Sequence, residues 1–237
     1  MKKSYCCIWL LLYSICCCVS VYAQVNKATY LQDVKAALEK KWPDNKTVNL
    51  VFHGHSVPSG YFKTPVVNTL QAYPYLLLQS LKTIYPYAVI NIIVTSIGGE
   101  NSVQGEKRFK KDVLTHQPDV LFIDYALNDQ AIGLTASRTA MEKMIRMALK
   151  KKIKVILLTP SPDMRVDLSK KDNPLALQAA QLNALAEQYR IGVADSYLAF
   201  KTQLDAGKPV EQFMSQVNHP NEEGHQLIKG AILPWFK

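Results

Sequence analysis

Four separated segments of the chain carry the residue types that acyl transfer by a serine requires. The reaction needs a hydroxyl nucleophile, a base within hydrogen-bond reach, and N–H donors for the oxyanion that develops on the substrate carbonyl. Ser56 can supply the hydroxyl and one backbone N–H, and His219 is a candidate general base. Gly99 lets a second backbone N–H approach a substrate, and Asn128 offers a side-chain amide donor. These residues predict serine-dependent chemistry if the fold brings them together.

The elements that must position these residues are predicted from hydrophobic patterning. Four strands are predicted from apolar, β-branched runs at 48–52, 89–95, 119–124 and 154–159, and a shorter run at 192–194 predicts a fifth. The runs are nearly continuous, which is typical of strands buried on both faces of a parallel sheet. Helical spacing predicts helices at 30–42, 73–84, 102–115, 135–150, 174–189 and 221–233. The alternation predicts an α/β fold, a three-layer α/β/α sandwich with a central, mostly parallel five-stranded sheet.

The carboxyl ends of parallel strands meet at one edge of such a sheet, and this edge is where sites lie in these folds. Ser56 follows the first predicted strand, Gly99 the second and Asn128 the third. His219 lies in the loop before the last predicted helix, which the fold would return to the same edge. We therefore expect all four residues at one site.

The four segments, in this order, resemble the four blocks of the SGNH (GDSL-type) hydrolase family. The blocks read G-H-S at 54–56, I-G-G-E-N-S at 97–102, A-L-N-D at 126–129 and H-P-N at 219–221. Each block alone is common, but together they extend over nearly the whole chain after residue 23. The resemblance implies a flavodoxin-like SGNH hydrolase fold and a serine esterase or acylhydrolase that works through an acyl-enzyme. It implies no cofactor and no metal.

Three positions depart from the family pattern, one of them Ala126, which stands where the family usually has Gly. His55 stands where the family has Asp beside the nucleophile, and Gln216 stands where an acid usually orients and charges the base. Gln216 can orient the imidazole but supplies no charge, so Glu211, Glu222, Asp129 and a backbone carbonyl are further candidates for this role. The neutral Gln216 also keeps a second hypothesis open, a non-catalytic glycan-binding protein on a decayed hydrolase fold.

A metal site is an alternative explanation for the histidines. Four of the five, His53, His55, His219 and His225, lie in the segments expected at the site. A His-x-His pair at a strand end can bind zinc, but carboxylate support is not evident and His225 falls inside the last predicted helix. We expect no metal. His53 is expected to pack beneath the nucleophile loop, and His55 to line the pocket or to replace the hydrogen bonds of the family's Asp.

The loops that follow the strands predict a pocket for an acylated sugar. Tyr61 and Tyr125 could stack on a sugar ring, and His55 and Arg165 are further candidates for the lining. No long apolar cap segment is present to shield a fatty acyl chain. This favours a short acyl group such as acetyl, and therefore a small-molecule or glycan ester as the substrate.

The first 23 residues have the features of a signal peptide. Lys2 and Lys3 precede an apolar run that is short for a membrane span, and the sequence V-Y-A at 21–23 suits cleavage after Ala23. All five cysteines lie in this segment, at Cys6, Cys7, Cys16, Cys17 and Cys18. The remaining chain therefore has no disulfide framework and no thiolate nucleophile. We expect residues 24–237 to form one secreted or periplasmic domain without an integral membrane segment after cleavage.

The charge of the chain does not indicate a nucleic-acid partner. The 28 basic and 19 acidic residues give a net charge of +9, and removal of Lys2 and Lys3 leaves +7. The lysines are scattered or gather at predicted helix ends, where cations suit the helix dipole. They are not interleaved with aromatic residues as in a nucleic-acid-binding surface.

Overall fold

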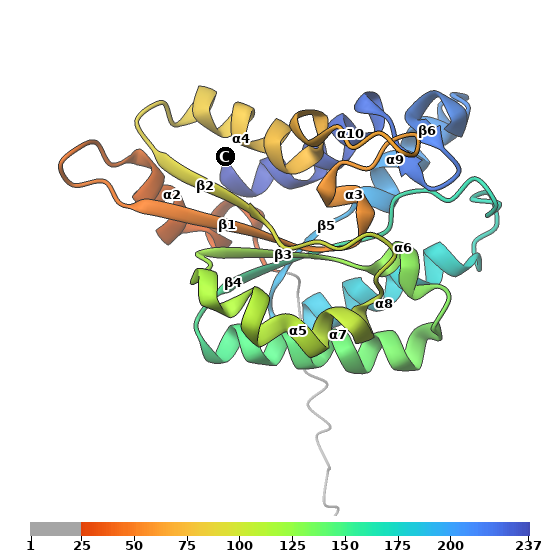
Figure 1. Cartoon of the computed structure of the whole chain (residues 1–237), viewed down its shortest axis with the longest axis horizontal. Helices are drawn as coiled ribbons and strands as arrows, with labels where there is room; N and C mark the ends of the chain where they lie inside the picture. The colour runs from red at the N-terminus through yellow and green to blue at the C-terminus, as the bar shows by residue number, and fades with distance from the viewer. Residues whose placement is uncertain (1–24) are drawn as a thin grey trace, which may run out of the picture.

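A central parallel sheet organises the chain (Figure 1). The computed structural model describes residues 25–237, and the predicted signal peptide lies outside the described residues. The strands are β1 (Thr47–Gly54), β2 (Val89–Val94), β3 (Val120–Asp124), β4 (Lys154–Leu158) and β5 (Gly192–Ala194). They pair in parallel in the order β2-β1-β3-β4-β5. The predicted α/β architecture is confirmed, and the order in which the chain adds strands reverses between β1 and β3, the switch point of the sheet.

Helices cover both faces of the sheet. One face is covered mainly by α2 (Gln32–Glu39), α4 (Tyr73–Ile84), α9 (Ser196–Asp205) and α10 (Glu222–Ile232). The other is covered by α5 (Ser102–Asp112), α7 (Gly133–Lys150) and α8 (Pro174–Tyr189), which lie below the sheet in Figure 1. None of the helices between residues 25 and 237 is long and apolar enough to cross a membrane.

The strand sequences alternate between the two cores. In β3, Val120 and Phe122 belong to the hydrophobic cluster between the sheet and helices α4 and α10. Leu121 and Ile123 belong to the cluster between the sheet and helices α5 and α7. All four are fully buried. Successive side chains of a strand point to opposite faces, so a sheet covered on both sides needs an apolar residue at every position. This explains the continuous apolar runs of the sequence.

Short elements complete the carboxyl edge of the sheet. A single turn, α3 (Ser56–Ser59), follows β1, and α6 (Ala126–Asp129) follows β3. Strands β6 (Met214–Gln216) and β7 (His219–Pro220) form a small antiparallel hairpin before α10. Within residues 25–237, 3₁₀ helices are also present at Thr69–Gln71, Leu114–His116, Val210–Phe213 and Leu233–Phe236.

Two helix predictions need correction. The predicted helix at 30–42 is two pieces, α1 (Lys27–Tyr30) and α2, because the fully buried Leu31 leaves helical geometry at φ −101° and ψ 23°. Helix α2 ends at Glu39, because the next residue, Lys40, is extended. Pro43 also disfavours helical geometry at the residue before it. Helix α9 was not predicted, although Asp195 caps it by accepting a hydrogen bond from the Leu198 N–H.

Candidate active site

Ser56 lies at a sharp turn between β1 and α3. The turn passes close to β3, and a Cβ at Gly54 would lie 2.4 Å from the Asp124 carbonyl oxygen, so this position requires glycine. His55 caps α3 because its Nδ1 accepts a hydrogen bond from the Val57 N–H at 3.2 Å. The other nitrogen of His55 lies 3.4 Å from Oδ1 of Asp124. His55 thus takes over the capping role that a carboxylate can play at the start of a helix.

The β6–β7 hairpin brings His219 to Ser56. The Nε2 atom of His219 lies 2.9 Å from the Oγ atom of Ser56, and both residues are buried, with 8% and 6% of their surface exposed. Asn221 anchors the chain after the hairpin by accepting a hydrogen bond from the Gly224 N–H at 3.1 Å, which caps α10. Ser56 and His219 therefore have the separation that proton transfer from a nucleophile to a general base requires.

Two groups compete for the second nitrogen of His219. The Nδ1 atom lies 2.9 Å from the Phe62 carbonyl oxygen and 2.7 Å from Nε2 of Gln216, whose oxygen accepts from the Thr64 N–H at 3.0 Å. When Nδ1 carries the proton, it donates to Phe62, and Nε2 is free to accept the proton of Ser56. When Nδ1 is bare, it accepts from Gln216, and Nε2 then carries the proton and cannot act as a base. The Phe62 carbonyl therefore favours the competent tautomer, and the Gln216 amide favours the other.

The surroundings of His219 keep it neutral. Burial lowers the pKa of His219 below its usual 6.5, and the nearby His55 lowers it further. The hydrogen bond to the Phe62 carbonyl opposes these effects without reversing them. A neutral imidazole at neutral pH is the form that can accept a proton.

The three carboxylates that were predicted as candidate orienters lie elsewhere. Asp129 is buried and accepts a hydrogen bond from the Ser102 N–H at 2.8 Å. Glu222 is exposed in the first turn of α10, and Glu211 is exposed in the 3₁₀ helix before β6. Within the described residues, no carboxylate forms an ion pair with His219. The prediction is wrong for all three, and the backbone carbonyl, also considered, occupies the position.

Gly99 and Asn128 line a cavity at the carboxyl edge of the sheet. Gly99 lies in the glycine loop, defined here as residues 95–101, and adopts a φ of +79°, with no atom within 4 Å of the position that a Cβ would take. Ile97 of this loop donates a hydrogen bond to the Gly54 carbonyl, which ties the loop to the end of β1. Asn128 donates one amide hydrogen to the Glu100 carbonyl at 2.8 Å. The cavity, of about 350 Å³, has further polar lining from Asn101, Gln130, Asp163, Arg165 and Asn218.

The predicted substrate-lining residues divide into two groups. Arg165 lines this cavity, and the partly exposed Tyr61 lies with its ring centroid 5.9 Å from that of His219. Tyr125 and His55 are fully buried, so the prediction that they line the pocket is wrong. Tyr125 turns toward α5 instead, and His55 serves as the cap described above, which was its alternative role.

The remaining histidines do not converge with His219 on one centre. His53 is buried as predicted, with its nitrogens 2.9 Å from the Thr95 hydroxyl and 3.2 Å from the Gly105 carbonyl. His225 accepts a hydrogen bond from the Tyr73 N–H and stacks on Phe62 at 5.1 Å. Over residues 25–237, no three His, Cys, Asp or Glu side chains are placed to hold a metal ion.

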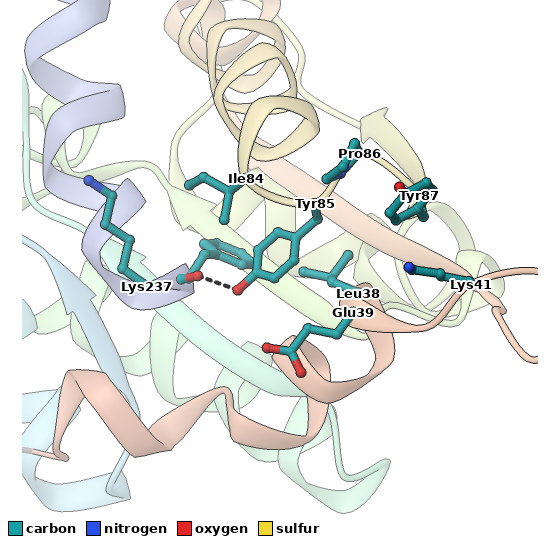
Figure 2. A pocket seen from close by; sticks show the side chains of 9 residues that line it. Leu38, Glu39, Lys41, Ile84, Tyr85, Pro86, Tyr87 and Lys237 are labelled. Atoms are coloured by element: carbon teal, nitrogen blue, oxygen red, sulfur yellow. Dashed lines mark hydrogen bonds between the residues drawn. The ribbon is translucent and has the colours of Figure 1, made fainter.

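A larger cavity lies at the amino ends of β1 and β2, away from Ser56 (Figure 2). Its volume is about 640 Å³, and Leu38, Ile84 and Tyr85 contribute to its walls. The Tyr85 hydroxyl donates to the Phe236 carbonyl across it at 2.5 Å. Its lining contains none of the four predicted catalytic residues, whereas Gly99 and Asn128 line the smaller cavity.

Sequence reasoning missed three participants. Phe62 acts through its carbonyl oxygen, which every residue carries, so no residue type could have indicated it. Glu100 and Arg108 form a partly buried ion pair behind the glycine loop. The only feature of the sequence that could have indicated this ion pair was the charged Glu100 directly after Gly99, in a segment already assigned to the site.

A parallel α/β sheet with a buried Ser–His pair at its carboxyl edge is the architecture of a class of serine hydrolases. The chain belongs to the GDSL-like lipase/acylhydrolase family, whose model matches residues 52–227. This confirms the resemblance to SGNH hydrolases. No curated protein sequence matches the chain.

Solved structures of esterases share the fold. A two-domain esterase (CEX) active on acetylated mannans superposes with a TM-score of 0.72 at 21% identity, over 87% of this chain and 52% of the esterase. The chain thus spans about half the length of that protein. A catalytic mutant of Axe2, an acetylxylan esterase from Geobacillus stearothermophilus, gives a TM-score of 0.68 at 18% identity, over 80% of this chain and 94% of the enzyme.

Proposed function

We propose that the chain is a secreted serine esterase that removes short acyl groups, acetyl foremost, from carbohydrate. The observation that carries the proposal is the 2.9 Å contact between the Ser56 hydroxyl and Nε2 of His219, with Nδ1 held at the Phe62 carbonyl. The family membership supports ester hydrolysis, and the acetylated mannan and acetylxylan substrates of the structural neighbours support the acyl group and the sugar. Secretion is inferred from the first 23 residues of the sequence.

In the first half of the proposed reaction, the Ser56 oxygen attacks the ester carbonyl carbon while Nε2 of His219 takes the hydroxyl proton. The carbonyl oxygen becomes an oxyanion, which accepts hydrogen bonds from the backbone N–H groups of Ser56 and Gly99 and from the Asn128 amide. When the tetrahedral intermediate collapses, the bond to the sugar oxygen breaks, and His219 returns the proton to that oxygen.

In the second half, water hydrolyses the acyl-enzyme. His219 takes a proton from the water as it attacks the carbonyl carbon, and the same donors hold the new oxyanion. Collapse releases the carboxylic acid and returns the proton to the Ser56 oxygen. No step requires a cofactor.

The cavity beside Gly99 suits a neutral sugar as the alcohol part of the ester. Arg165 donates to both carboxylate oxygens of the buried Asp163, at 2.8 and 2.5 Å, and Gln130 donates to the same carboxylate at 3.3 Å. The charges of the pair therefore cancel at the cavity wall. Amide and paired charged groups offer hydrogen bonds to sugar hydroxyls, and the side chains of Leu127, Ala131 and Val166 supply the apolar part of the lining.

The proposal is tested with p-nitrophenyl esters and acetylated oligosaccharides. We expect a burst of p-nitrophenol from the acetate ester, hydrolysis that falls steeply from acetate to palmitate, and acetate release from acetylated manno- or xylo-oligosaccharides. Ser56→Ala and His219→Ala should abolish turnover. The matched controls Ser80→Ala and His116→Ala should not. The Ser80 hydroxyl donates to the Leu76 carbonyl of its own helix, α4, and His116 lies just before β3, at the opposite end of the sheet. Equal rates for wild type and Ser56→Ala would refute the proposal.

The missing carboxylate at His219 favours one alternative, a glycan-binding protein without catalysis. A fluorophosphonate distinguishes the two functions because it labels only an activated serine. The esterase predicts labelling that Ser56→Ala removes. The binding protein predicts no labelling, together with polysaccharide binding that Ser56→Ala leaves intact.

A further inference from the structure

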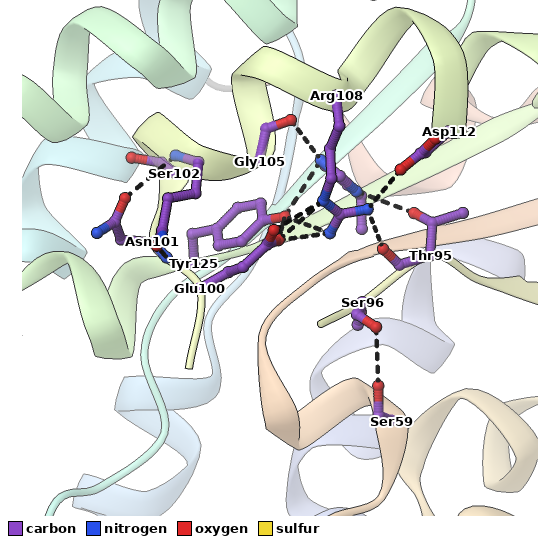
Figure 3. A network of polar contacts seen from close by, with 12 residues as sticks. Ser59, Thr95, Ser96, Glu100, Asn101, Ser102, Gly105, Arg108, Asp112 and Tyr125 are labelled. Atoms are coloured by element: carbon purple, nitrogen blue, oxygen red, sulfur yellow. Dashed lines mark hydrogen bonds and ion pairs between the residues drawn. The ribbon is translucent and has the colours of Figure 1, made fainter. Parts of the chain in front are cut away.

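One arginine closes the glycine loop at both ends (Figure 3). The Nη1 atom of Arg108, on α5, donates to the Thr95 carbonyl at 2.6 Å, where the loop leaves β2. Its Nε atom donates to the two carboxylate oxygens of Glu100 at 3.0 and 2.9 Å, and Nη2 adds a contact of 2.5 Å. Between these two anchors lie Gly98 and Gly99, whose backbones are the least restricted of any residue type. The guanidinium therefore restrains both ends of the glycine loop, in addition to the hydrogen bond from Ile97 to the Gly54 carbonyl.

Glu100 also connects the loop to the third predicted oxyanion donor. Its carbonyl oxygen accepts one of the two amide hydrogens of Asn128 at 2.8 Å. The amide group is planar, so this bond sets the direction of the other hydrogen. Glu100 is also the residue directly after Gly99. The positions of two of the three predicted donors, the Gly99 N–H and the Asn128 amide, thus depend on where Glu100 is held.

The Tyr125 hydroxyl adds a third group to the ion pair between Arg108 and Glu100. Its hydroxyl donates to the Glu100 carboxylate and accepts from Nη2 of Arg108, each at 3.2 Å. The ring reaches this position because Gly105 of α5 has no side chain, since a Cβ there would lie 2.3 Å from the hydroxyl oxygen. The ion pair is well shielded from water, with 15% of the Arg108 side chain and 12% of the Glu100 side chain exposed. Forked, charge-assisted hydrogen bonds of this kind fix geometry more tightly than a point charge does.

We propose that Arg108 and Glu100 are positioning residues that hold the oxyanion donors in place for the reaction. The inference rests on the proposed function, because it assigns the pair a role in the same acyl transfer. Neither side chain contacts the reacting atoms in this arrangement. Each acts through the backbone of the glycine loop and through Asn128.

The test compares Arg108→Lys, Arg108→Gln and Glu100→Gln with the control Arg138→Gln. Arg138 also forms an arginine–glutamate pair, with Glu142, but on the surface of α7. Loss of one oxyanion donor lowers kcat by roughly 10²–10³-fold, so a displaced donor should lower kcat by roughly 10- to 100-fold. We expect this loss with p-nitrophenyl acetate, with KM changed less than about threefold, because the donors act on the transition state rather than on the bound ester.

Inhibition by phenylboronic acid gives a readout that a purely structural role would not move. This compound adds to a reactive serine and becomes tetrahedral, so its binding should weaken in the three variants by about the same factor as kcat. Arg108→Lys keeps the charge but cannot bind both ends of the loop, so it should resemble Arg108→Gln. Rates are compared well below the melting temperature of every variant, which separates the effect from unfolding.

Hydrogen–deuterium exchange over residues 95–101 tests the contact without reference to activity. Exchange should be faster in the Arg108 variants than in wild type and in Arg138→Gln. Unchanged exchange in the Arg108 variants would overturn the inference. It would also be overturned if Arg108→Gln and Arg108→Lys fold and show wild-type kcat and wild-type inhibition. A wild-type protein without esterase activity but with faster exchange in the variants would instead refute the proposed function and keep the loop-holding role.

Discussion

Replacement of Gln216 by glutamate probes how the base is oriented. Glutamate has nearly the shape of glutamine, so a carboxylate oxygen would take the place of the amide nitrogen that now lies 2.7 Å from Nδ1 of His219. The other oxygen could still accept from the Thr64 N–H. The substitution removes the donor that stabilises the wrong tautomer and adds a negative charge beside the imidazolium that forms during the reaction.

The size of the effect follows from this distance. Two unit charges 2.7 Å apart interact by ~1.5 kcal/mol even at the dielectric constant of water, which corresponds to about one pKa unit. Because His219 is buried, the shift should be at least this large. The negative charge favours the protonated ring, so the pKa of His219 rises. A charged orienter contributes up to about 10⁴-fold in established triads, so we expect kcat in Gln216→Glu to increase about 10-fold or more.

The assay is the pH dependence of kcat/KM for p-nitrophenyl acetate. Activity requires neutral His219, so its acid limb in wild type should lie below pH 6.5, because burial lowers the pKa of this residue. In Gln216→Glu the limb should move to higher pH by about one unit or more. Gln203→Glu, which adds the same charge on α9, should leave the limb in place. An unmoved limb together with wild-type kcat in Gln216→Glu would show that residue 216 does not interact with Nδ1 in the working enzyme.

Three further substitutions test other parts of the structure. Burial raises the pKa of Asp129 from 3.8 to about 6, so its contribution to stability is present at low pH and is lost as the pH rises through 6. Asparagine at this position can still accept the hydrogen bond from the Ser102 N–H. Asp129→Asn should therefore raise the unfolding free energy, measured with urea, by up to about 3 kcal/mol above pH 7 but not below pH 4. An equal gain at both pH values would contradict this. Gly105→Ala should lower the unfolding free energy by about 1–3 kcal/mol, because its Cβ would overlap the Tyr125 hydroxyl, and an unchanged melting temperature would show that the slot can widen. Gly99→Ala should cost only about 1 kcal/mol of stability, since its φ of +79° is the sole conflict. It should lower kcat, because relief of that φ would move the Gly99 N–H and the new methyl group would enter the cavity; wild-type kcat would show that alanine holds the N–H in the same place.

The strands of the sheet and their places along the chain could be expected from sequence, because burial on two faces leaves a local trace. A run such as Val120–Asp124 is apolar at four successive positions, and only a strand packed on both sides requires this. The parallel direction then places Ser56, Gly99 and Asn128 at one edge without any knowledge of side-chain contacts. The pairing of Ser56 with His219 needed the family resemblance as well, since 163 residues separate the two.

The errors concern side chains whose direction depends on a partner far away in the chain. Tyr125 was expected to contact a sugar because it follows a strand at the site. Its ring instead enters a slot that exists only because Gly105, in a different element of the fold, has no side chain, and Glu100 and Arg108 satisfy its hydroxyl there. No local pattern encodes such a match between positions, just as none encodes the approach of the Phe62 carbonyl to His219.

The neutral surroundings of His219 have a consequence for the conditions in which the site can work. In a triad, the acid makes the base stronger but also keeps it protonated up to higher pH. At this site a carbonyl orients the ring without adding charge, and burial lowers the pKa of the base. The weaker base should reduce the maximal rate, yet the ring remains neutral, and the serine can be activated, at lower pH than in an enzyme with the carboxylate. Burial of His219 and the absence of a charge at Gln216 should therefore favour activity in mildly acidic surroundings at the expense of the maximal rate. The pH profile of Gln216→Glu should show the opposite change in both quantities.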